Sequence, residues 1–140
     1  MIKYYIINRK NPVNKSEKFY AQLSAGAPVT LTELTEKIVQ RCTLTKPDVQ
    51  AAIAAFEEEV TAALMQGRSV KFGTLGCFRP SLGSTGSMDK EGFTSKNIKR
   101  VKVVFTPSPT IRTSLKPGQP GISFQMVNRA TDEVVEDGGV

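Results

Sequence analysis

The chain contains no histidine and no tryptophan among its 140 residues. Without histidine it lacks the commonest general base and the commonest neutral metal ligand, and no Ser–His or Cys–His pair can form. The glycines form no phosphate-binding Gly-x-x-x-x-Gly-Lys-Ser/Thr pattern, and the acidic residues show no catalytic spacing. We therefore expect a protein that is not an enzyme and that holds no metal ion, no cofactor and no small-molecule substrate.

Cysteine and long apolar runs are also scarce. Cys42 and Cys77 are the two cysteines of the chain, and their spacing matches no metal site. We expect free thiols in a reducing cytoplasm, with Cys42 buried on the apolar stripe of a helix. No apolar run is long enough to cross a bilayer, and the short apolar segment 1–7 lacks the features of a signal peptide. The sequence thus predicts a cytoplasmic protein with no membrane partner.

Positive charge is what the chain has in excess, with a net charge of +6. Residues 67–116 hold ten lysines and arginines against two acidic residues. Residues 1–29 are also basic, with a net charge of +4, whereas residues 30–66 and 117–140 each carry −3. Clustered cations are typical of a protein whose partner is a polyanion, although solvated lysine-rich surfaces are common too.

The hydrophobic pattern predicts a mixture of strands and helices. Aromatic and β-branched residues gather in short runs on either side of two longer segments with helical periodicity. The expected strands are residues 2–7, 18–23, 69–72, 78–79, 98–105 and 122–127, and the expected helices are residues 31–42, 46–66 and 110–115. The acidic tail that follows is expected to be disordered.

The two longer helices begin with the same local signal. Thr30 and Glu33 stand at the spacing of a capping box, and so do Thr45 and Asp48. Behind these caps, apolar residues recur at helical spacing at Leu31, Leu34, Ile38 and Cys42, and then at Val49, Ile53, Phe56, Val60 and Leu64. We therefore expect two amphipathic helices.

The segment 67–80 connects the second helix to the basic half of the chain. Gly67 is expected in the left-handed conformation that ends a helix. Gly73 and Gly76 predict a bulge, a bend or a close backbone approach within a hairpin, and Pro80 excludes a central-strand position after it. Residues 82–93 are poor in apolar side chains and should be exposed and mobile.

This order of elements resembles the HU/IHF family of bacterial histone-like DNA-bending proteins. The segment 67–78 looks like the glycine-hinged turn of that family, and Phe105-Thr-Pro107 is similar to the sequence that leads into its last helix. The resemblance implies an α+β fold with an N-terminal helix pair, a bent β-hairpin sheet with an extended basic arm, and a short C-terminal helix. It also implies an intertwined homodimer whose core includes Phe56 and Phe78.

The resemblance covers the chain from about Thr30 to Leu115 and so predicts three parts. Residues 1–29 form an N-terminal β-hairpin extension and linker, and residues 30–116 form the HU/IHF-like DNA-binding domain, with its arm at about 80–100. Residues 117–140 form a C-terminal strand and the acidic tail. The first and last parts lie outside the usual bounds of the family.

Duplex DNA is the partner that the resemblance implies. Phosphate contacts need long cationic side chains spaced along an extended ribbon. The candidates on the arm are Arg79, Lys90, Lys96, Lys99, Arg100 and Lys102. Period-two alternation places Arg100 and Lys102 on one face of the strand 98–105, together with Ile98 and Val104. The alternative explanation of these cations is the polar side of an edge strand, where lysine also blocks aggregation.

The arm tip departs from the family, in which an Arg-Asn-Pro sequence inserts its proline between base pairs. Residues 81–99 contain neither proline nor arginine. Phe93 and Met88 are candidates for intercalation in its place, and packing of Phe93 against its own arm is the alternative. We expect a sequence-tolerant, histone-like architectural protein of the nucleoid that binds duplex DNA. The alternative is an HU-like structural or protein-interaction module that has lost tight DNA binding.

Overall fold

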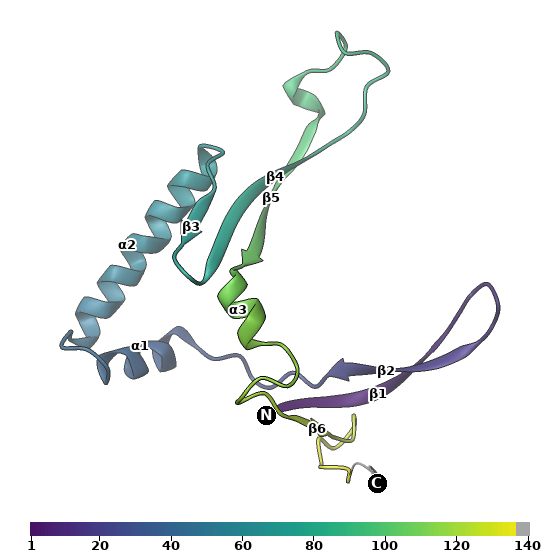
Figure 1. The fold of residues 1–140 in the computed structure, drawn as a ribbon. Coiled ribbons are helices and arrows are strands. Elements are labelled where there is room, and N and C mark those ends of the chain that lie inside the picture. Colours follow the sequence, from purple (N-terminus) through teal and green to yellow (C-terminus); the bar gives the residue numbers. More distant parts are fainter. Residues whose placement is uncertain (137–140) are drawn as a thin grey trace. The chain divides into compact units, whose positions relative to one another are not determined.

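The computed structural model describes residues 1–136, which form two compact units. One unit is Val29–Thr113, and the other joins Met1–Pro28 to the residues from Ser114 onward. These residues contain three α-helices and two three-stranded sheets, as expected of an α+β protein (Figure 1). No helix within the described residues combines the length and the apolar character needed to cross a membrane.

The Val29–Thr113 unit begins with a pair of helices, α1, Leu31–Val39, and α2, Lys46–Met65. Both predicted capping boxes are present: the Thr30 hydroxyl accepts from the Glu33 N–H at 3.3 Å, and the Thr45 hydroxyl accepts from the Asp48 N–H at 3.4 Å. In each box the acidic side chain accepts the N–H of the threonine in return. The starts of both helices were therefore predicted correctly.

The predicted end of α1 and the predicted burial of Cys42 are both wrong. The helix ends at Val39, and the Arg41 N–H bonds to the Ile38 carbonyl in a tighter turn. Cys42 lies beyond that turn and is exposed, because the chain has left the helical path that would have placed it on the apolar stripe. Both thiols are free, as predicted.

The second helix ends as the sequence indicates. Gly67 has a φ of +75°, its N–H bonds to the Leu64 carbonyl, and the Arg68 N–H bonds to the Ala63 carbonyl. This double bond pattern is the Schellman motif, in which glycine avoids the steric cost of a left-handed residue. The chain then turns directly into the sheet.

The sheet of this unit has the strand order β3-β4-β5. Its strands are β3, Val70–Phe72, β4, Gly76–Ser84, and β5, Ile98–Pro107, and both pairs are antiparallel. A short 3-10 turn, Ser95–Asn97, precedes β5, and helix α3, Pro109–Ser114, follows it. The Ser108 hydroxyl donates to the Thr74 carbonyl, and the Ser108 N–H bonds to the Leu75 carbonyl at 3.1 Å. Ser108 thus ties the start of α3 to the turn between β3 and β4.

The prediction that no central strand follows Pro80 is confirmed: β4 continues through Pro80 to Ser84, but there it is one of two strands and not the middle of a sheet. The pairing of β3 with β4 ends at Phe78, so β4 has only β5 as a neighbour from Arg79 onward. Proline is tolerated in such a strand because one of its sides has no partner strand. The two strands therefore extend beyond β3 as a ribbon, which Figure 1 shows projecting from the rest of its unit.

The other unit is a three-stranded sheet with the order β2-β1-β6. β1, Ile2–Lys10, pairs antiparallel with β2, Glu17–Leu23, and parallel with β6, Phe124–Met126. The sequence predicted these strands and the hairpin of the first two, which the structure confirms, but it did not predict the pairing of β6 with β1. The two ends of the chain thus build one sheet, with Tyr4 opposite both Leu23 and Met126.

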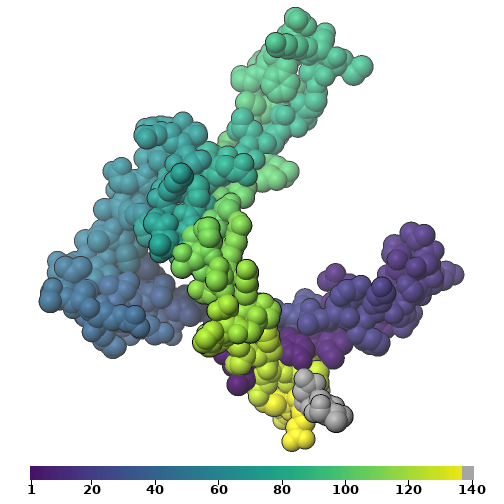
Figure 2. Space-filling model, in the orientation of Figure 1, coloured from purple at the N-terminus to yellow at the C-terminus, as the bar shows by residue number. Residues whose placement is uncertain are grey.

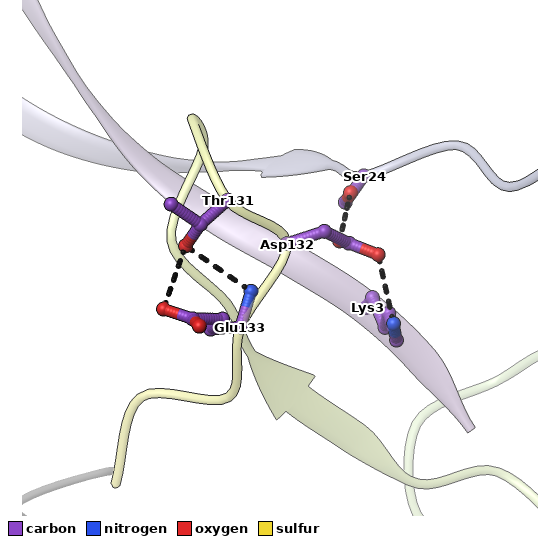
Figure 3. A network of polar contacts seen from close by, with 5 residues as sticks. All are labelled: Lys3, Ser24, Thr131, Asp132 and Glu133. Carbon is purple, nitrogen blue, oxygen red and sulfur yellow. Dashed lines mark hydrogen bonds and ion pairs between the residues drawn. The ribbon is translucent and has the colours of Figure 1, made fainter.

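The predicted disorder of the acidic tail is wrong for the residues up to 136, and residues 137–140 lie outside the described part. Asp132 accepts from the Lys3 ammonium at 2.8 Å and from the Ser24 hydroxyl at 3.0 Å (Figure 3). The Arg129 guanidinium lies 5.4 Å from the ring centre of Tyr5, and Val134 bridges to Val127. These contacts, which sequence periodicity does not reveal, hold the tail against β1.

Few side chains are buried in the single chain. Val49 and Val127 are the buried hydrophobic residues of the described part, and Thr35 is buried with its hydroxyl bonded to the Leu31 carbonyl at 2.8 Å. The accessible surface is 11685 Å² for a mass of 15.3 kDa. Two compact units that together have this mass would have an accessible surface of roughly 8,600 Å², because the accessible surface of compact proteins scales with their mass. The chain exposes roughly 3,100 Å² more than these two compact units would.

Candidate nucleic-acid interface

The ribbon formed by β4 and β5 has two chemically different faces. Residues opposite each other in an antiparallel pair share a face, and successive residues alternate. The register pairs Arg79 with Val104, Ser81 with Lys102 and Gly83 with Arg100. Arg79, Lys102 and Arg100 therefore lie on one face of the arm.

The opposite face of the arm is apolar. Its register pairs are Phe78 with Phe105, Pro80 with Val103 and Leu82 with Val101. The rings of Phe78 and Phe105 pack with their centres 5.2 Å apart. Farther out the face is open: Leu82 and Val101 are each 64% exposed. The arm thus separates a cationic face from an apolar one.

A β-bulge sets the end of both faces. The register shifts between Gly83, which is opposite Arg100, and Ser84, which is opposite Ile98, so Lys99 is the extra residue. Ile98 shares the face of Ser84 and lies opposite to the face of Arg100. The prediction that Ile98 lies beside Arg100 is therefore wrong, because simple period-two alternation does not allow for an extra residue. The bulge adds Ile98 to the apolar face and leaves the face of Arg100 and Lys102 cationic.

Glycine at position 83 makes room for Arg100. A Cβ atom built on Gly83 would lie 2.8 Å from Cγ and 2.9 Å from Nε of Arg100, so the arginine side chain lies directly over this glycine. The stem of Arg100 can cross the ribbon here because no side chain stands in its way. Its guanidinium is consequently carried over the cationic face.

All six predicted basic side chains are exposed: Arg79, Lys90, Lys96, Lys99, Arg100 and Lys102. Within residues 1–136 none of them forms an ion pair, in contrast to Lys3, Lys10 and Lys46, which each pair with a carboxylate. Lys99 donates to the Lys96 carbonyl at 3.1 Å and so turns back on the arm. The structure therefore brings three of the six together on one face, and it leaves Lys90, Lys96 and Lys99 toward the tip.

The spacing of this face suits a phosphate backbone. Strand residues rise by about 3.3 Å, so Arg100 and Lys102 are separated by roughly 7 Å along the ribbon. One strand of DNA carries one charge per about 3.4 Å of helix axis, so cations at this separation can contact different phosphates of one strand. Because no carboxylate of residues 1–136 pairs with these three cations, their charge is available to an anionic ligand.

The arm tip is held by local polar contacts that the sequence analysis missed. The Asn97 side chain accepts from the Thr94 N–H at 3.0 Å, and its backbone carbonyl accepts from the Thr85 N–H at 2.9 Å. Asn97 thereby links the two sides of the loop just below the tip. The sequence carried a signal for it, since Thr94 and Asn97 stand at capping-box spacing with asparagine in place of the usual acid.

The two candidates for intercalation differ in exposure. Met88 is fully exposed at 103%, and Phe93 is half-exposed at 43%. The Phe93 N–H bonds to the Lys90 carbonyl at 3.3 Å, and the Asp89 carboxylate accepts from the Gly92 N–H at 2.7 Å. Residues 84–93 are exposed, as predicted, but the predicted loop begins too early, because residues 82–84 belong to β4 and Gly83 is half-buried; the mobility of the loop stays a prediction. The role of both side chains stays a prediction.

The helices of the same unit also present uncovered apolar surface. Leu31, Leu34 and Ile38 on α1 are 49%, 45% and 41% exposed. On α2, Phe56 is 37% exposed although its ring lies 4.5 Å from that of Phe72, centre to centre. The predicted amphipathic stripe of α1 is therefore largely open in the single chain.

The side chains that could bind a metal ion do not cluster in the described residues. No group of three or more histidine, cysteine, aspartate or glutamate side chains within residues 1–136 could hold a metal ion. The hollows on the surface are open, and one of 280 Å³ beside α1 is lined by Glu36, Val39, Gln40 and Lys46. The basic arm is the feature with a defined chemistry.

A helix pair, a bent sheet and a basic two-stranded arm define an α+β protein of the HU type. The comparisons agree with this class. The family described as "HU domain fused to wHTH, Ig, or Glycine-rich motif" matches residues 1–120, which includes the N-terminal hairpin. The chain belongs to this HU/IHF-like family.

Two known proteins are similar to the chain. The integration host factor subunit alpha of Actinobacillus succinogenes is 29% identical over 94 residues, which cover 66% of this chain and 96% of that protein. A crystal structure of a presumed bacterial DNA-binding protein from Bacteroides vulgatus superposes with a TM-score of 0.59 at 17% identity. That match covers 81% of this chain but 44% of the crystallised chain, and it supports the fold alone.

Proposed function

We propose that this chain is a sequence-tolerant, histone-like architectural protein that binds duplex DNA as a homodimer through its basic arms. The observation that carries the proposal is the arm face with Arg79, Arg100 and Lys102, all exposed and without an ion pair in the described residues. Cations spaced along a ribbon neutralise phosphates and read little sequence. The relatives, an integration host factor subunit and a presumed DNA-binding protein, favour the same partner.

The homodimer is proposed from the uncovered apolar surface. An interface that covers about half of this excess on each of two chains would bury roughly 3,100 Å² in total, which lies within the range for obligate dimers. The open stripe of α1 and the apolar face of the arm supply side chains of the kind found in such interfaces. Pairing two chains would cover these surfaces and present two cationic faces to one duplex.

Domain boundaries and location follow from the same proposal. Residues 30–116 form the DNA-binding domain, with the arm at about 80–100, and residues 1–29 and 117–140 are extensions. Such a protein acts in the nucleoid of a bacterial cell. No catalytic step, cofactor or small-molecule substrate belongs to this function.

The test is a binding titration with duplexes of unrelated sequence, accompanied by sedimentation of the free protein. We expect similar dissociation constants for all duplexes and a sedimenting mass of about twice that of the chain at micromolar concentration. Absence of binding to every duplex at low salt, by a folded dimer, would refute DNA binding. That outcome would leave the second candidate function, a protein-interaction module, which the open apolar face around Leu82 and Val101 favours.

A further inference from the structure

The hairpin of β1 and β2 carries a second concentration of unneutralised positive charge. Its outer half, residues 8–19, is exposed throughout. This part contains Arg9, Lys10, Lys15 and Lys18 but only one acidic residue, Glu17. Figure 2 shows its end, drawn in purple, as open surface within its own unit. The hairpin is not part of the arm site described above.

The single carboxylate of this hairpin is fully engaged on one face. Glu17 pairs with the Lys10 ammonium at 2.8 Å and accepts from the Asn8 amide at 2.9 Å. The Lys10 contact, followed by the Asn8 contact, lowers the pKa of Glu17 below its usual value. Glu17 therefore stays ionised and bound to Lys10, and the register places both on the same face.

The opposite face holds two like charges that form no ion pair within residues 1–136. The register places Arg9 directly opposite Lys18, and like charges in such a pair destabilise the ribbon. The Arg9 guanidinium lies 5.7 Å from the ring centre of Tyr20 on that face. Charge of either sign would protect an exposed strand from edge pairing, so protection alone does not explain a pair of cations. A polyanionic partner would remove the repulsion.

The loop at the end of the hairpin fixes one more cation. The Asn11 side chain accepts from the Val13 N–H at 2.9 Å, and the Asn14 side chain accepts from the Ser16 N–H at 3.0 Å. Lys15 has a φ of +56°, a left-handed conformation that glycine or asparagine would adopt at lower cost. The loop, which these local hydrogen bonds stabilise, therefore has a lysine at a position where the backbone conformation would favour glycine or asparagine.

We infer that the face of Arg9 and Lys18, together with Lys15 in the adjoining loop, is a second contact surface for duplex DNA. This inference rests on the proposed function, because the ligand is the same duplex that the arms bind. The three cations would contact phosphates, and Tyr20 would hold the Arg9 guanidinium in place. The role of this hairpin is to add phosphate contacts to those that the arms make.

The test uses the full chain and the variant K15A/K18A, which spares the Arg9–Tyr20 contact and the Lys10–Glu17 pair. Binding of a fluorescent duplex of about 40 base pairs is measured at several salt concentrations. Each lost phosphate contact flattens the plot of log K against log salt by about 0.9, so we expect a change of about 1.8 per chain. The control K37A/R41A removes the same charge from another part of the surface and should leave the slope unchanged.

A second measurement separates a binding role from a structural one. Because Lys18 faces Arg9, Lys18→Ala should leave the melting temperature of the free protein unchanged or raise it. A lowered melting temperature would show that Lys18 supports the fold and would overturn the inference. The inference would also be overturned if K15A/K18A bound duplex DNA as tightly as the parent chain, or if it lost affinity only for RNA, anionic vesicles or an acidic protein.

The two proposals fail in different ways. If the parent chain binds no duplex, DNA binding as such is refuted. If the parent chain binds and R100A/K102A weakens binding while K15A/K18A does not, the arm proposal stands and the hairpin inference alone is wrong.

Discussion

Replacing Gly76 by alanine should destabilise the protein, because two parts of the neighbouring strand leave no room for a methyl group. A Cβ atom built on Gly76 would collide with the Thr106 carbonyl oxygen and would lie 2.7 Å from a ring carbon of Phe105. The carbonyl belongs to the backbone of β5, and the Phe105 ring is packed against Phe78, so neither can simply rotate away.

The expected loss follows from the cost of overpacking, which is about 1–3 kcal/mol. At an m value of about 2 kcal/mol/M, a loss of 2 kcal/mol lowers the midpoint of urea unfolding by about 1 M. Protein concentration must be the same for all variants, because the stability of a dimer depends on it. The control is Gly86→Ala, since nothing lies within 4 Å of a Cβ atom at that position.

Gly86→Ala should change the free energy of unfolding by less than about 0.5 kcal/mol. If Gly76→Ala were as stable as this control, the close approach of β4 and β5 would not be what requires glycine at position 76. The conclusion that Gly76 packs tightly against Thr106 and Phe105 of β5 would then be wrong.

Three further outcomes are expected. Cys42, which is exposed, should react with a thiol reagent before half-buried Cys77, and reductant should leave the melting temperature unchanged; a native disulfide found by mass spectrometry would contradict this. The contact with Lys3, and then that with Ser24, lowers the pKa of Asp132. Because the folded pKa lies below the unfolded one, this stabilisation is present above pH ~4 and is lost as the pH falls through the folded pKa. In an NMR titration the Asp132 pKa should rise in Lys3→Ala, and an unchanged pKa would exclude the ion pair. Phe93→Ala should reduce DNA bending, measured by energy transfer between the duplex ends, if Phe93 intercalates, whereas unchanged bending would indicate local packing.

Local signals predicted the elements of this fold well. The two capping boxes and Gly67 are decided by neighbours within a few residues, so the sequence alone locates both helix starts and the end of α2. The end of α1 was missed because no glycine marks it and a tightened turn replaces the expected last turn. The continuation of β4 through Pro80 depends on where β3 ends, which is a property of the pairing and not of the proline.

The candidate site was predicted in part. Period-two alternation placed Arg100 and Lys102 together, but the bulge at Lys99 moves Ile98 to the other face, and Arg79 joins them only through the register with β5. The docking of the tail by Asp132 joins residues 129 positions apart, and no periodic pattern reports such a contact. Strand register and contacts between distant parts of the chain could therefore not be predicted from local sequence patterns.

In the proposed function, the cationic faces of two arms bind DNA phosphates. The most direct measurement is the slope of log K against log salt for the parent chain and for R100A/K102A. Arg79, Arg100 and Lys102 from two chains make six phosphate contacts and contribute about −5 to the slope, to which the hairpins add if they also bind. Removing four of these contacts should flatten the slope by about 3.6 and weaken binding to all sequences alike. K37A/R41A is the matched control, and both variants must be folded. If the slope of R100A/K102A were unchanged, the cationic faces of the arms would not bind phosphates.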